Sequence, residues 1–245
     1  KHMRMGAVSF GYILGLYIRR LKSSKEHSII AWTVNKVEGG TMRKIAGICL
    51  SVFFCMGLLS GCSQQTDVET STVFVEKKGS IVSVDVEKFD KEYYDSEELE
   101  KYITERIEVY NKTSGDAVEK SSFDVEEDTA KLKMRYQSFE DYAKFNGIEF
   151  FTGTVVAAQA EGYDFDTEFY GVSEKKDGQK DVNSKDILKE DNNKVVVIKA
   201  NVDVKVDGTV LYVSKQDTKV TAKDTVSIMG EGANEEAALT YIIYN

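Results

Sequence analysis

Short stretches of alternating apolar and polar residues run along the chain beyond residue 71. Residues 82–86 and 131–136 show this alternation most clearly, and it is typical of β-strands with one buried and one solvated face. Gly79 precedes the first stretch and can adopt the positive φ of a hairpin loop. Residues 195–198 are instead continuously apolar, which predicts a strand buried on both faces.

Helical spacing also occurs along the chain. Apolar and aromatic residues recur at intervals of three and four over residues 96–111, where Asp95 precedes Glu98 at the spacing of a capping box. Shorter helices are predicted over residues 138–146 and 154–161, each followed by a glycine. The predicted helices are therefore few and short.

The pair Asp207-Gly208 predicts a two-residue hairpin turn between strands at 202–206 and 210–213. Predicted strands outnumber predicted helices, and no regular strand-helix alternation of the parallel type appears. We therefore predict an α+β fold, an antiparallel hairpin-rich sheet with two or three short helices on one face, as a single domain over residues 72–245.

A different pattern precedes this domain. Met42, Arg43 and Lys44 are followed by fifteen uncharged, mostly apolar residues, 45–59. A segment of this length falls short of the roughly 20 residues that cross a bilayer comfortably, and a polar stretch follows soon after. A basic start, an apolar centre and a small-residue end are the parts of a secretion signal.

The end of this segment is its most specific feature. Leu59, Ser60, Gly61 and Cys62 match the bacterial lipobox, in which an apolar residue and two small residues precede a cysteine. The chain therefore resembles a bacterial lipoprotein, similar to the uncharacterised surface lipoproteins of Gram-positive bacteria. The resemblance implies cleavage before Cys62, a covalent diacylglycerol on the Cys62 thiol and a location on the outer face of the cytoplasmic membrane. An apolar segment with an incidental cysteine is the alternative.

These features divide the chain. We expect translation to begin at Met42, so that residues 1–41 are untranslated upstream sequence, although a genuine N-terminal extension is the alternative. Residues 42–61 are then the signal peptide, and residues 62–71, which are small and polar, form a flexible tether.

Charge and composition exclude several functions. Residues 1–61 hold 9 of the 32 basic and 2 of the 41 acidic residues, which leaves 23 basic and 39 acidic residues and a net charge of −16 from Cys62 onward. Nucleic acid is therefore a poor partner. Both histidines, His2 and His27, precede Cys62, so a mature chain lacks the histidine of Ser-His-Asp or Cys-His catalysis and of the usual zinc sites.

Carboxylates remain as candidate functional groups. Asp164, Asp166 and Glu168, in the sequence EGYDFDTEFYG, are the densest acids among aromatic residues, and they are candidates for a calcium site or a sugar-contacting rim. The alternative is a solvated loop whose aromatic residues pack inward, namely Tyr163, Phe165 and Phe169.

Aromatic residues also crowd residues 136–151. An exposed aromatic patch there would mark a surface for a partner or ligand, and packing in the core is the alternative. We interpret the aromatic residues of the helix at 96–111 as core residues too, with a binding face as the alternative.

We therefore expect a membrane-anchored, non-enzymatic binding or interaction module whose ligand is an extracellular molecule or an envelope protein. The alternative is a carboxylate-dependent hydrolase or a calcium-dependent carbohydrate binder that acts on cell-wall or external glycans. Hydrolysis that is lost on changing one carboxylate would favour the hydrolase.

Overall fold

The computed structural model describes residues 13, 17–18, 67–172, 180–190, 192–229 and 237–245. Two compact units are present, one formed by Lys1–Gly15 with Val68–Asn245 and the other by Leu16–Asp67. The first unit contains every strand in the described part of the chain. The predicted signal peptide at 42–61, Cys62 and most of residues 1–41 lie outside the described residues, so these assignments stay predictions.

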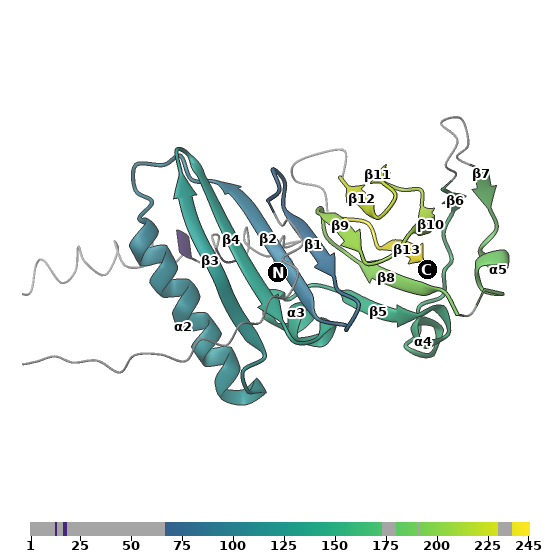
Figure 1. Ribbon diagram of the computed structural model, residues 1–245, viewed down its shortest axis with the longest axis horizontal. Helices are drawn as coiled ribbons and strands as arrows, with labels where there is room; N and C mark the ends of the chain where they lie inside the picture. The colour runs from purple at the N-terminus through teal and green to yellow at the C-terminus, as the bar shows by residue number, and fades with distance from the viewer. Residues whose placement is uncertain (1–12, 14–16, 19–66, 173–179, 191, 230–236) are drawn as a thin grey trace, which may run out of the picture. The chain divides into compact units, whose positions relative to one another are not determined.

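One sheet of seven strands runs through the first unit (Figure 1). Its order is β11-β12-β9-β1-β2-β4-β3, with β1 (Thr72–Val75), β2 (Ile81–Lys88), β3 (Val118–Glu126), β4 (Thr129–Tyr136), β9 (Asp203–Val206), β11 (Thr218–Ala222) and β12 (Thr225–Ile228). Neighbouring strands are antiparallel except β1 and β9, which are parallel and place Val73 opposite Val204.

A second sheet of six antiparallel strands has the order β5-β8-β13-β10-β6-β7. Its strands are β5 (Phe150–Thr154), β6 (Phe169–Gly171), β7 (Lys180–Val182), β8 (Lys194–Ile198), β10 (Val210–Ser214) and β13 (Thr240–Tyr244). Strand β8 lies inside this sheet, and its apolar residues 195–198 are fully buried, as predicted.

Four helices accompany the sheets in the described residues, α2 (Ser96–Ser114), α3 (Phe139–Asn146), α4 (Val155–Ala160) and α5 (Ser184–Ile187). The predicted α+β class is confirmed, but the strands form two sheets rather than one. Sequence patterns gave no sign of this division because each strand pattern reports only its own buried face.

The predicted hairpin turn at Asp207-Gly208 is wrong. Strand β9 before it belongs to the first sheet and β10 after it to the second, so the chain passes from one sheet to the other at this point. A Cβ atom at Gly208 would lie 2.0 Å from the carbonyl oxygen of Asn245. Glycine is therefore required here because another backbone segment approaches closely.

The capping residues in the sequence correctly predicted the start of α2 and both ends of α3. The Asp95 carboxylate accepts a hydrogen bond from the backbone N–H of Glu98 at 2.8 Å, so α2 begins where the capping pattern predicts. The helix continues three residues beyond the predicted end and stops at Gly115, whose φ is 68°. Helix α3 has Ser138 as its N-cap and Gly147 in the left-handed region after its last turn, both as predicted.

Helix α3 joins the two sheets through aromatic contacts. Its Tyr142 ring lies 5.0 Å from Tyr136 of β4 and 4.9 Å from Phe150 of β5, centroid to centroid. Tyr136, Tyr142, Phe145, Phe150 and Phe151 are all at most 7% exposed. The crowded aromatic residues at 136–151 therefore belong to the core, and the exposed patch considered from the sequence does not form.

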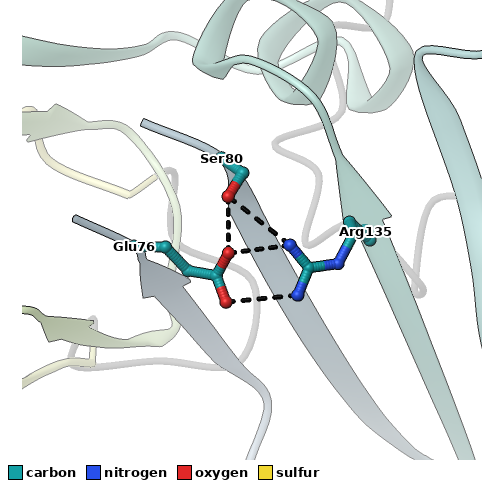
Figure 2. A network of polar contacts seen from close by, with 3 residues as sticks. All are labelled: Glu76, Ser80 and Arg135. Atoms are coloured by element: carbon teal, nitrogen blue, oxygen red, sulfur yellow. Dashed lines mark hydrogen bonds and ion pairs between the residues drawn. The ribbon is translucent and has the colours of Figure 1, made fainter. Parts of the chain in front are cut away.

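The opposite face of β4 carries charged side chains. Both terminal nitrogens of the Arg135 guanidinium donate to the Glu76 carboxylate, at 2.8 and 3.2 Å, and the Ser80 hydroxyl donates to the same group (Figure 2). Burial raises the pKa of Glu76, but the hydrogen bonds from Arg135 and Ser80 outweigh it and hold the pKa below its usual value. This network ties the loop between β1 and β2 to β4.

Glu87 near the end of β2 gives a testable pH dependence. Burial raises the pKa of its carboxyl above the usual 4.5, so the folded state binds the proton more strongly than the unfolded state does. The protonated Glu87 carboxyl therefore contributes to the free energy of unfolding. This contribution is complete below pH 4.5 and is lost as the pH rises through the pKa of the folded state. We expect Glu87→Gln to raise the Tm by roughly 1–3 °C at pH 7 and to leave it nearly unchanged at pH 4.

Thermal unfolding followed by circular dichroism at both pH values tests this expectation. The exposed Glu92 is the matched control, and Glu92→Gln should change the Tm at neither pH. An equal increase for Glu87→Gln at pH 4 and pH 7 would mean that removal of the buried charge is not the cause.

Candidate ligand-binding groove

The three acids singled out from the sequence lie in the segment between α4 and β6. Asp164, Asp166 and Glu168 are all exposed, and an Asp164 carboxylate oxygen accepts the backbone N–H of Asp166 at 2.9 Å. Phe165 and Phe169 between them are at most 1% exposed and pack inward. Within the described part of the chain, no group of three His, Cys, Asp or Glu residues is placed to hold a metal ion.

Glu168 forms an ion pair with Lys215, a residue that the sequence analysis did not single out. The Lys215 ammonium lies 2.9 Å from a carboxylate oxygen of Asp181 and 3.4 Å from one of Glu168. Its hydrogen bond to Asp181 and the charge of both carboxylates raise the pKa of Lys215. Because the ammonium stays protonated at neutral pH, Glu168 takes part in a surface ion pair.

A groove of about 350 Å³ lies between α2 and the end of α3. It is lined by three aromatic residues, one aliphatic residue and two cations, namely Tyr102, Tyr110, Phe145, Val109, Arg106 and Lys144. Its volume is within the range of about 300–1,000 Å³ that is usual for small-molecule sites. This groove is the strongest candidate site in the described residues.

The groove exists because α2 is amphipathic. Leu99 and Ile103 are fully buried, and they fix which side of the helix faces the core. Residues 102, 106, 109 and 110 recur at intervals of three and four and form an adjacent stripe along the helix. The predicted aromatic stripe of this helix is therefore divided, with Leu99 and Ile103 in the core and the two tyrosines beside the groove.

Contacts between aromatic rings bring α3 against this stripe. The rings of Tyr110 and Phe145 meet edge to face with their centroids 5.4 Å apart. The Tyr110 hydroxyl also donates to a carboxylate oxygen of Asp141 at 3.0 Å. Burial, together with this hydrogen bond to a carboxylate, raises the pKa of Tyr110, so its hydroxyl remains a neutral donor at physiological pH.

Both cations of the groove lie over aromatic rings. The Lys144 ammonium is 5.6 Å from the centroid of Tyr110, and the Arg106 guanidinium carbon is 5.5 Å from that of Phe145. These distances are within the roughly 6 Å of a cation–π interaction. Glu105 contributes one carboxylate to the lining, so the groove has an excess of one positive charge in a domain that is strongly negative.

A second groove, of about 430 Å³, lies along the other flank of α2 where it meets β3. Its lining includes the carboxylates Glu108, Asp116 and Glu119. The side-chain amide of Asn111 there exchanges two hydrogen bonds with the backbone of Val118, at 2.8 and 3.1 Å, and so holds α2 to β3. We interpret this groove as the structural junction of the helix and the sheet.

The lining of the α2–α3 groove combines aromatic rings with a guanidinium, an ammonium and the Glu105 carboxylate. These groups can contact an apolar surface and a charged group of a ligand. Arg106 is four residues from both Tyr102 and Tyr110, a pattern visible in the sequence. Lys144 lies on another helix, so sequence reasoning did not join it to them.

No helix in the described ranges has both the length and the apolar character needed to cross a membrane. Comparison of the chain with models of known protein families, with curated proteins and with solved structures gave no match.

Proposed function

We propose that this chain is a lipid-anchored, non-enzymatic binding module on the outer face of the cytoplasmic membrane. The observation that carries the proposal is the sequence Leu59-Ser60-Gly61-Cys62, which ends ten residues before the first strand at Thr72. One acyl chain gives only marginal membrane binding, whereas two hold a protein stably. The α2–α3 groove is the surface that meets the ligand.

The topology supports an anchor at this end of the chain. The ten residues from Cys62 to Thr72 extend at most about 36 Å, so the start of β1 would lie within that distance of the anchor. Strand β1, which follows the tether, lies between β2 and β9 inside the seven-stranded sheet.

We infer that the fold is hairpin-rich, because antiparallel pairs join the consecutive strands β1–β2, β3–β4, β6–β7 and β11–β12.

Binding is favoured over hydrolysis by the positions of the carboxylates. Asp164 and Asp166 are exposed and Glu168 is paired with Lys215, whereas a glycoside hydrolase needs two carboxyl groups that flank one bond. The proposal therefore expects no turnover on any glycan. The binding partner is an extracellular molecule or another envelope protein.

Labelling of intact cells tests the proposed location. A membrane-impermeant, amine-reactive biotin reagent should label the protein, since Lys77 and Lys78 in the loop after β1 are exposed. A cytoplasmic protein of the same cells, which should stay unlabelled, is the control for lysis. If the protein is labelled only after the cells are broken, the proposed location is wrong.

A further inference from the structure

We propose that the α2–α3 groove binds a small anionic ligand with a planar apolar body, the anionic group meeting Lys144 and the body lying on Val109 and the neighbouring rings. This inference rests on the proposed function in that it names the ligand class of the same binding module. The geometry and charge of the groove carry it.

The positive charge of the groove favours a ligand with an anionic group. The chain from Cys62 onward has a net charge of −16, so most of its surface repels anions. The groove has two cations and one carboxylate in its lining. Among the described residues, no carboxylate oxygen lies within 4.0 Å of the Lys144 ammonium, which lies over the Tyr110 ring. An anion can therefore gain a charge-assisted hydrogen bond from Lys144 without breaking an ion pair.

The apolar residues of the lining favour a ligand whose remaining part is apolar. Val109 is 65% exposed, one of few large hydrophobic side chains that face solvent in the described residues. It lies beside the rings of Tyr102, Tyr110 and Phe145 in the same groove. A planar apolar body would remove this surface from water, at about 25 cal/mol per Å² of apolar area, and the volume of about 350 Å³ limits the ligand to a small molecule.

Two matched probes separate these contributions. Naphthalene-2-sulfonate is a planar anion, and naphthalene-2-sulfonamide has the same rings with a neutral group. Both are titrated by calorimetry into the full-length protein in a non-ionic detergent, with protein-free micelles as the blank. We expect the sulfonate to bind at one site and more tightly than the sulfonamide.

Variants assign the binding to the groove. Lys144→Gln should weaken the sulfonate about tenfold, as the loss of one charged hydrogen bond predicts, and should leave the sulfonamide unchanged. Val109→Ser should weaken both probes by a similar factor. Lys219→Gln, at an exposed lysine of β11, is the matched control and should change neither.

Three results would overturn the inference: no sulfonate binding to the unmodified protein, equal losses for both probes on Lys144→Gln, or the same loss on Lys219→Gln. Lys144 is exposed, and in the described part of the chain it contacts the Tyr110 ring at the surface, so its variant should keep the Tm of the parent protein. Because the titration does not depend on the lipid, its failure is distinguishable from a failure of the proposed anchor or location.

Discussion

Replacement of Cys62 by alanine is expected to abolish fatty-acid incorporation into the protein completely. The thiol is the only group through which a diacylglycerol can be attached as a thioether at this position, and alanine keeps the small size of the residue. Cells fed an alkyne-tagged fatty acid and then analysed by in-gel fluorescence of the immunoprecipitated protein give the readout. The parent protein should be strongly labelled and the variant should be dark.

Cys55 provides a matched control for this result. It lies seven residues earlier, inside the apolar stretch 45–59, and it is outside the lipobox. Cys55→Ala should incorporate the fatty acid as the parent protein does. Labelling that survives Cys62→Ala, or that is lost equally in Cys55→Ala, would contradict the assignment.

Replacement of Phe165 by alanine should lower the free energy of unfolding by about 3–5 kcal/mol. The Phe165 side chain is fully buried, and its ring lies 4.8 Å from that of Tyr241, centroid to centroid. Its φ of 56° lies in the left-handed region, which is uncommon for a bulky residue, so packing must hold it there. A domain of this size is stable by about 5–15 kcal/mol, and the loss is therefore a large fraction of the total.

Urea denaturation, followed by far-ultraviolet circular dichroism, measures the change in the free energy of unfolding. Tyr93→Ala is the control, because the Tyr93 side chain is 50% exposed, and it should alter the free energy by less than about 0.5 kcal/mol. A loss below about 1 kcal/mol for Phe165→Ala would mean that the loop is not held by its inward ring. Asp164 and Asp166 would then regain the freedom to converge on a cation.

Features that depend on a few adjacent residues were predictable from the sequence. The Asp95 cap of α2 and the alternation of residues 131–136 appear in the structure as predicted, because both reflect the local backbone and the identity of its buried face. Strand partners were not predictable in this way. Strand β1 pairs with β9, and Val73 lies beside Val204, 131 residues later, which no local pattern records.

The Asp207-Gly208 pair shows how a strong local signal can mislead. Its residue types suit a two-residue hairpin turn, but the same glycine also permits close backbone approach, and the structure uses it against Asn245. Which use applies depends on the tertiary neighbours of the segment. The division of the strands into two sheets was missed for the same reason.

The candidate site was only partly accessible from the sequence. Density of acidic residues led to Asp164, Asp166 and Glu168, but in an acidic chain such clusters arise readily on solvated loops, and these three are exposed. The groove instead combines Arg106 of α2 with Lys144 of α3. Their proximity depends on the packing of Tyr110 against Phe145, and sequence spacing alone does not reveal it.

The intact mass of the native protein, extracted in detergent from its own cells, is the decisive measurement for the proposed anchor. We expect a species that begins at Cys62 and carries a diacylglycerol on that residue. An unlipidated chain that retains the residues before Cys62 would contradict it. In that case the lipobox would be a coincidence, and His2, His27, Cys49 and Cys55 would return as candidate functional residues.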